Sequence, residues 1–166
     1  MFVVTLGGNP SAVAAKFLLL YRNWTSQHAM AKDFYHENVR QALESDGWRI
    51  THDPYPVKVD EVGYEIDFAA EPLLAAEKGE VKIAVEVKSF IGPSTINEFH
   101  RAVGQFNDYF VALETYDPER ILFLAIPEDI WLRFFQKPII QKSLQRIGAR
   151  VLVYDPLQNK VVSWIN

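Results

Sequence analysis

The segment "ILFLAI", residues 121–126, is apolar at every position and constrains the fold more than any other stretch of the chain. A strand that is solvated on one face alternates apolar and polar residues, whereas a strand covered by helices on both faces does not. We therefore expect a central strand here, with helices on both sides of a sheet. The predicted fold class is α/β.

Two earlier segments carry charge inside a strand pattern. In "VKIAVEVK" the odd-numbered positions are all apolar, and the even-numbered positions include Glu86 and Lys88. In "YEIDFAA", Ile66 and Phe68 are predicted to share one face of a strand and Asp67 the other, by the two-residue period. Asp67, Glu86 and Lys88 are therefore expected on one face of a sheet.

Two helices are predicted around these strands. The first covers about Phe34–Asp46, where Gly47 follows as a C-terminal stop. Thr95 and Glu98 have the spacing of a capping box and open a longer helix that reaches about Glu114. Its apolar stripe, predicted to pack on the sheet, comprises Ile96, Phe99, Val103, Phe106, Phe110 and Leu113.

The remaining segments complete a single domain over residues 30–166. "WRITHDPYPV" predicts a strand that ends in two prolines, which suits an edge position. A helical region from about Glu128 to Gln145 and two strands, "RVLVY" and "KVVSW", follow. Residues 1–29 are interpreted as an N-terminal extension outside the core, and their apolar run is too short to span a bilayer.

Composition limits the available chemistry. The chain has no cysteine, so disulfides and thiolate metal sites are excluded, and a cytoplasmic location is expected. A net charge of -4 argues against wholesale electrostatic attachment to DNA or to a membrane. From Arg133 to Arg150 the chain carries five basic residues and no acid. This run is interpreted as a solvated helix face, with a phosphate-contacting strip as the alternative.

The order of elements resembles the restriction-endonuclease-like fold, that of the PD-(D/E)xK nuclease superfamily. In this resemblance Asp67 is on the second strand, and Glu86 and Lys88 of the "EVK" motif follow on the third, 19 positions after the aspartate. Ile66 stands where the motif name has proline. The resemblance implies a restriction-endonuclease-like core with a mixed central sheet flanked by helices.

A narrower resemblance covers residues 30–166. The segments "AKDFYHENVRQALESDGWRITHDPYPV", "GYEIDFAAE", "IAVEVKSFIGPSTINEFHRAVGQFNDY" and "PERILFLAIP" are similar to the XisH family, the fdxN element excision controlling factors. The family resemblance implies Met30 as the natural start and a role in the excision of a DNA element. It also implies DNA, an XisI-type partner protein and a site-specific recombinase as partners.

The superfamily resemblance implies a metal site. Carboxylates are hard ligands that suit Mg²⁺ or Mn²⁺. Asp67, Glu86 and the carbonyl of Val87 would hold the ion, and Lys88 would orient or deprotonate a water and stabilise phosphate charge. The alternative is that these charges form ordinary cross-strand ion pairs.

Two further residues are candidates for the same catalytic site. Gln105 lies four positions before Tyr109, which resembles the Q-x-x-x-Y element of some superfamily members. His36 is predicted at the edge of the buried face of the first helix, either as a structural histidine or as a group that reaches the site. Glu37 is expected to be exposed. Surface and turn positions are expected for Glu71, Glu77 and Glu80.

Two functions remain open at this stage. The first is a metal-dependent DNA endonuclease that acts in excision of a DNA element by site-specific recombination. The alternative is a non-catalytic, DNA-associated accessory protein that acts through a partner. No membrane partner is expected, and self-association into a homo-oligomer stays open.

Overall fold

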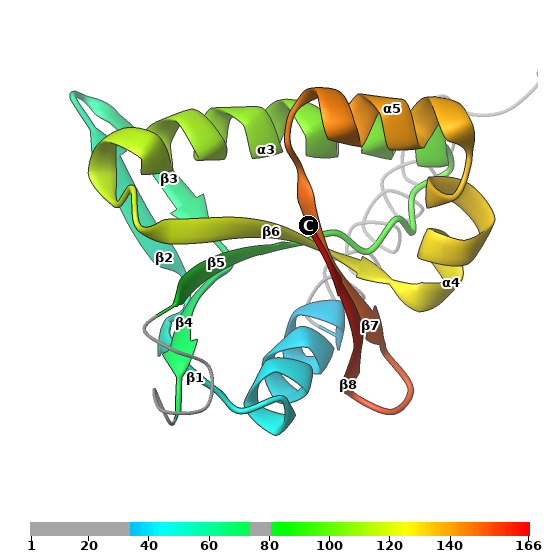
Figure 1. The fold of residues 1–166 in the computed structure, drawn as a ribbon, viewed down its shortest axis with the longest axis horizontal. Coiled ribbons are helices and arrows are strands. Elements are labelled where there is room, and N and C mark those ends of the chain that lie inside the picture. Colours follow the sequence, from blue (N-terminus) through cyan, green and yellow to red (C-terminus); the bar gives the residue numbers. More distant parts are fainter. Residues whose placement is uncertain (1–33, 74–80) are drawn as a thin grey trace, which may run out of the picture.

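The computed structural model describes residues 34–73 and 81–166, in which a helix over residues 34–45 precedes the first strand (Figure 1). The predicted turn residues Glu77 and Glu80 and the predicted extension lie outside the described residues. The elements that follow are β1 (Trp48–His52), β2 (Tyr55–Val59), β3 (Val62–Ile66), β4 (Phe68–Pro72), β5 (Lys82–Val87), α3 (Thr95–Tyr116), β6 (Arg120–Pro127), α4 (Glu128–Ile130), the π-helical turn η1 (Trp131–Phe135), α5 (Pro138–Arg146), β7 (Arg150–Asp155) and β8 (Lys160–Ile165).

Six strands form one mixed sheet in the order β1-β4-β5-β6-β7-β8, and β2 pairs with β3 in a separate hairpin. The central pairs β5–β6 and β6–β7 are parallel, and the outer pairs β1–β4, β4–β5 and β7–β8 are antiparallel. β6 lies inside the sheet and is buried along most of its length, which confirms the prediction from "ILFLAI". The edge position predicted for the first strand is also confirmed, because β1 ends the sheet.

The predicted α/β class, with a mixed sheet flanked by helices, is confirmed (Figure 1). One core lies between the sheet and α3, and includes Ala84, Leu124 and Val153. The other lies on the opposite face beneath the helix over residues 34–45, and includes Val85 and Phe123. Adjacent residues of β5 and β6 therefore enter different cores, as the two-residue period of a strand requires.

The sheet is curled toward the helix over residues 34–45. Trp48 of β1 and Trp164 of β8, from the two outermost strands, bring their ring centroids within 5.6 Å. Both rings pack beside Phe123, which belongs to the core on that face. Curling closes this core at both sheet edges, since aromatic side chains from the first and last strands meet across it.

The single strand predicted from Tyr64 to Ala70 is wrong, because the chain breaks there into β3 and β4. Ile66 is buried in the core beneath α3, whereas Phe68 is buried in the opposite core. The predicted common face for Ile66 and Phe68 is therefore also wrong. Asp67 lies at the break, where the chain leaves the hairpin and enters the sheet.

The start of α3 also differs from the prediction. Ser94 is the N-cap residue, and its hydroxyl oxygen accepts a hydrogen bond from the backbone N–H of Asn97. The predicted partner Glu98 instead accepts from the backbone N–H of Gly92 at 3.0 Å. The cap lies one residue before Thr95, since a hydroxyl at the N-cap meets the donor three positions later.

The buried face of α3 is rotated relative to the predicted stripe. Phe99, Phe106 and Leu113 are buried as expected, but Ile96 is 42% exposed and Tyr109 is buried. Small side chains at positions 102 and 112 let this face approach the sheet closely.

The predicted helical region after β6 is present in three pieces, and Pro138 begins the last of them. No helix of the described residues is long and apolar enough to cross a membrane.

Candidate active site

The site begins where the pairing of β4 with β5 ends. The last paired residues are Phe68 and Val85, and beyond them the carboxylate of Asp67 accepts a hydrogen bond from the backbone N–H of Val87 at 2.8 Å. A side-chain oxygen thus takes the place that a strand carbonyl would occupy. The contact sets the Asp67 carboxylate against the strand segment that carries Glu86.

Glu86 is the buried acid of the site, with only 4% of its surface exposed. It shares its strand face with Ala84 and so points toward α3. The pKa of its carboxyl is raised from 4.5 to about 7, chiefly by burial and next by the negative charge of Asp67, while the Lys88 ammonium lowers it. The site therefore holds two electrostatically coupled carboxylates, one of which titrates near neutral pH.

Lys88 connects the strand to α3. Its ammonium donates to Glu86 Oε1 at 2.7 Å and to Gln105 Oε1 at 2.6 Å. Its backbone N–H donates to the carbonyl of Ala125 at 3.0 Å. Main chain and side chain are both anchored, so the ammonium is held beside the buried carboxylate.

Gln105 extends this network to the hairpin. Its amide Nε2 donates to the hydroxyl of Tyr109, which donates in turn to the carbonyl of Glu65 at 2.8 Å. Burial raises the pKa of the Tyr109 hydroxyl, and the charge of Glu86 adds to this effect. The structure thus brings Gln105 to the acidic residues, whereas helical spacing predicts only that Gln105 and Tyr109 lie on adjoining turns.

His36 approaches the site from the opposite face of the sheet. Its Nε2 lies 2.8 Å from Asp53 Oδ1, and its Nδ1 lies 3.7 Å from Asp67 Oδ1. The ring packs on Phe68 with centroids 4.1 Å apart, and Arg40 forms an ion pair with the same Asp53. Both interpretations of His36 hold in part, because it is hydrogen-bonded within the fold and also lies beside Asp67.

Asp53 is the residue of this cluster that sequence reasoning missed. It lies in the turn between β1 and β2, outside any periodic pattern, and it precedes Pro54. An acid in a proline-containing turn is ordinarily interpreted as turn chemistry. Only the packing of β1 beside the helix over residues 34–45 reveals its contact with His36.

The residues present fit a small divalent cation. A cavity of about 10 Å³, the size that holds one water molecule, lies on the His36 side of Asp67 and is lined by Tyr35, His36, Asp67, Val87 and Ser89, but not by Glu86. Among residues 34–73 and 81–166, no group of three or more His, Asp or Glu side chains is arranged to hold a metal. Two carboxylates and a carbonyl suit Mg²⁺ or Mn²⁺, which retain waters and bind substrate phosphate, better than a cation that needs a complete protein cage.

Other charged candidates lie away from this centre. Glu37 is exposed and bonds Gln41 within its own helix, as expected. Glu71 is partly buried and pairs with Arg49 and Arg120, so it is more than a turn charge.

The basic run from Arg133 to Arg150 contributes no residue to the acidic cluster. Arg133 pairs with Asp129 at 3.4 Å, and Lys137 lies over the ring of Phe134 at 5.1 Å. These contacts favour the solvated-face interpretation of at least the first part of the run.

Comparisons with known proteins agree on one family. The family model described as XisH protein matches residues 29–162. A crystal structure of an XisH family protein from Nostoc punctiforme is 41% identical and covers 80% of this chain and 99% of its own, with a TM-score of 0.74. A crystal structure of an fdxN element excision controlling factor protein from Anabaena variabilis is also 41% identical, covering 81% and 99%, with a TM-score of 0.74. None of the curated proteins matches the chain.

Proposed function

The chain belongs to the XisH family, and from this membership and the geometry of the acidic cluster we propose that it hydrolyses DNA phosphodiesters during the excision of a DNA element. The observation that carries the proposal is the fixed position of Asp67 beside the Glu86–Lys88 pair. Two carboxylates and an ammonium around one strand end match the residues that the PD-(D/E)xK resemblance assigns to cleavage. The relative from Anabaena variabilis supplies the link to element excision by its description.

Asp67 and Glu86, with the carbonyl of Val87, would hold Mg²⁺ or Mn²⁺. The bound ion would lower the pKa of a water and neutralise charge that develops on the phosphate. The raised pKa of the Glu86 carboxyl, about 7, is consistent with this role, because a buried carboxyl beside the charge of Asp67 is stabilised in its ionised form by a nearby cation. In this proposal the hydrogen bond from Val87 N–H positions the Asp67 carboxylate for the ion.

Lys88 would act directly on the substrate. The Lys88 side chain is 23% exposed, so its ammonium can contact a phosphate oxygen while it stays paired with Glu86. There it would stabilise negative charge and orient the attacking water. Gln105 is a positioning residue in this scheme, because its carbonyl oxygen holds the ammonium from the α3 side.

His36 would position Asp67 from the other face of the sheet. Its ring is held by Asp53 and packs at a tilt against Phe68, and its second nitrogen lies 3.7 Å from the Asp67 carboxylate. The same carboxylate thus has a backbone donor on one oxygen and an imidazole near the other. Rotation of the Asp67 side chain is opposed by both contacts.

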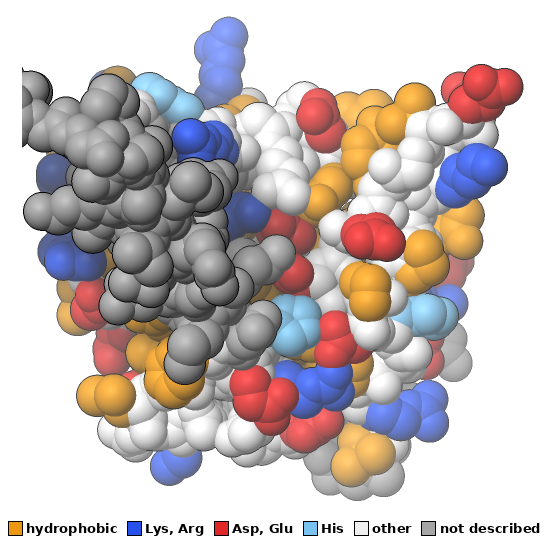
Figure 2. Space-filling model, turned by 180° about the vertical axis from the view of Figure 1, so that it is seen from behind, with side chains coloured by type: hydrophobic (Ala, Val, Ile, Leu, Met, Phe, Trp, Pro, Cys, Tyr) orange, Lys and Arg blue, Asp and Glu red, His pale blue; other side chains and the backbone are white. Residues whose placement is uncertain are grey.

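Binding to a DNA duplex would require help. The chain carries a net charge of -4, and on the face that Figure 2 shows, acidic and basic side chains are interspersed instead of forming one basic surface. Phosphate contacts need clustered Lys and Arg. We therefore retain an XisI-type partner protein and a site-specific recombinase as the proposed partners that bring the protein to DNA.

The test is cleavage of a supercoiled plasmid with Mg²⁺ or Mn²⁺. We expect nicking or linearisation by the native chain and a loss of at least about 100-fold in Asp67→Asn, Glu86→Gln and Lys88→Met. Glu114→Gln makes the same acid-to-amide change on the exposed surface of α3 and should cleave like the native chain. Cleavage that survives in Glu86→Gln would assign the activity elsewhere. No cleavage with either ion, with or without the partner protein, would favour the accessory role.

A further inference from the structure

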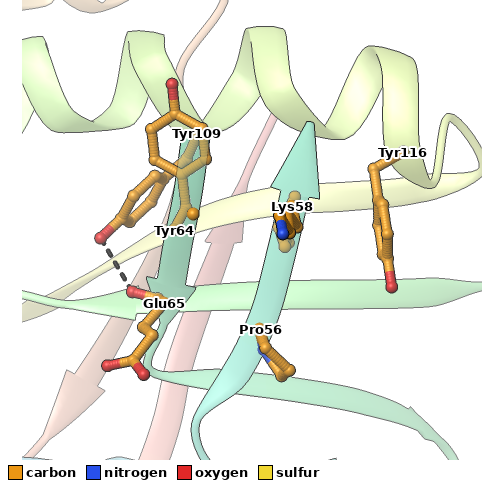
Figure 3. A pocket seen from close by; sticks show the side chains of 8 residues that line it. Pro56, Lys58, Tyr64, Glu65, Tyr109 and Tyr116 are labelled. Atoms are coloured by element: carbon orange, nitrogen blue, oxygen red, sulfur yellow. Dashed lines mark hydrogen bonds between the residues drawn. The ribbon is translucent and has the colours of Figure 1, made fainter. Parts of the chain in front are cut away.

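A large groove lies outside the acidic cluster. The hairpin β2–β3 and the C-terminal half of α3 border an open groove with a volume of about 730 Å³. Figure 3 shows Tyr109 and Tyr116 reaching from α3 on either side of Lys58, which rises from β2. The groove residues are Pro56, Val57, Lys58, Gly63, Tyr64, Glu65, Tyr109 and Tyr116.

The lining combines aromatic rings with one charge of each sign. Tyr116 is 51% exposed, and Tyr64 packs edge-on against Tyr109 with centroids 5.9 Å apart. Lys58 and Glu65 are both exposed and are the charged side chains that residues 34–73 and 81–166 contribute to the groove lining. An exposed ring with a nearby ammonium suits the face of a base and its phosphate, because every base offers a π surface for stacking.

The groove is connected to the acidic cluster through Tyr109. The Tyr109 ring lines the groove, while its hydroxyl is hydrogen-bonded to Gln105, whose carbonyl oxygen holds Lys88. The same hydroxyl donates to the backbone of Glu65, which ties the hairpin to α3 (Figure 3). A nucleotide chain held in the groove would therefore lie next to the residues proposed to cut it.

We propose that this groove binds unpaired DNA, with one base stacked on Tyr116 and another on Tyr64, a phosphate on Lys58, and an exocyclic amine of a base donating to Glu65. The inference rests on the proposed function, since it names the substrate form that the same site takes. The volume is within the range of small-ligand sites, about 300–1,000 Å³. A paired duplex buries its base faces and so offers the tyrosines no face to stack on, and its phosphates would meet a single lysine among the described residues of the groove. Glu65 would repel those phosphates but can accept from a base amine.

The test measures binding and cleavage separately. Fluorescence anisotropy of the full chain in EDTA would compare a labelled single-stranded DNA of about 12 nucleotides with its duplex. We expect tighter binding of the single strand, weakened roughly 5- to 150-fold in Tyr116→Ala or Tyr64→Ala. Lys58→Ala should reduce the slope of log K against log salt by about 0.7, the value for one phosphate of a single strand.

Matched controls lie outside the groove. Phe34→Ala removes an exposed ring from another helix, and Lys160→Ala removes an exposed ammonium from β8. Both should bind single strands like the native chain. Tyr116→Ala and Lys58→Ala should show the native melting temperature because these side chains are exposed. Tyr64 is partly buried against the core, so Tyr116→Ala carries the comparison if Tyr64→Ala melts at a lower temperature. If Tyr116→Ala melts at a lower temperature than the native chain, it is replaced by Tyr116→Leu, which keeps an apolar side chain but removes the aromatic ring.

Each outcome separates this inference from the proposed function. Groove-dependent binding without cleavage would support the groove and refute the nuclease. Cleavage that is unchanged in Tyr116→Ala, together with unchanged single-strand binding, would refute the groove and leave the nuclease. Equal affinity for duplex and single strand would also refute it, as would a Tyr116→Ala effect confined to binding of a protein partner.

Discussion

The raised pKa of Glu86 makes a quantitative prediction about stability. In the folded chain this carboxyl, 4% exposed, has its pKa raised from 4.5 to about 7, with burial as the largest cause and the Asp67 charge as the next. Between these two values the folded state binds a proton that the unfolded state has released. The free energy of unfolding therefore falls as the pH rises through this window, and the full cost is present above pH 7.

The magnitude follows from the shift. A change of 2.5 pH units at about 1.36 kcal/mol per unit limits the cost of ionising Glu86 to about 3 kcal/mol. Over the narrower interval from about pH 5 to about pH 8, linkage predicts a loss of about 2.5 kcal/mol. Glu86→Gln cannot ionise, so it should lack this loss while its amide oxygen still accepts from Lys88.

The assay is urea unfolding of the native chain and Glu86→Gln without metal. The stability of the variant relative to the native chain should increase by about 2.5 kcal/mol between about pH 5 and about pH 8. Other groups that titrate in this range act on both proteins and largely cancel in the difference. Glu114→Gln, the exposed control, should follow the native curve. A difference that stays constant with pH, or that favours the native chain as the pH rises, would refute the reasoning.

Three further predictions test the metal site and the packing. Millimolar Mg²⁺ or Mn²⁺ should raise the Tm of the native chain by about 3 °C in calorimetry, and less in Glu86→Gln; equal shifts in both would place the ion elsewhere. Arg120→Met should lower the free energy of unfolding, measured in urea, by about 3 kcal/mol, because the buried guanidinium donates to a backbone carbonyl and to a carboxylate. Arg146→Met, at an exposed position, should change it little. By the same measurement, Phe106→Ala should lower the free energy of unfolding by about 3–5 kcal/mol and Ile96→Ala by less than about 1 kcal/mol. Similar losses in the two variants would show that Ile96 is buried, as the helical period predicts.

Local periodicity alone determined much of the fold. The alternation in β5 set Glu86 and Lys88 on one face and Val85 on the other, and the uniformly apolar β6 required cover on both faces. Helical spacing brought Gln105 and Tyr109 to adjoining turns of α3. These features follow from the repeat of a strand or helix, which acts over a few residues and needs no knowledge of partners.

Only the tertiary structure decided which segments meet. The break at Asp67 reverses the facing of Ile66 and Phe68, since one strand joins the hairpin and the next joins the sheet. The contact of His36 with Asp53 has no local periodicity to predict it. The same is true of the pKa of Glu86, which depends first on how deeply the packed fold buries the carboxyl and next on the charge of Asp67. Burial and electrostatic interactions between distant segments depend on how the helices and strands pack, so local sequence does not determine them.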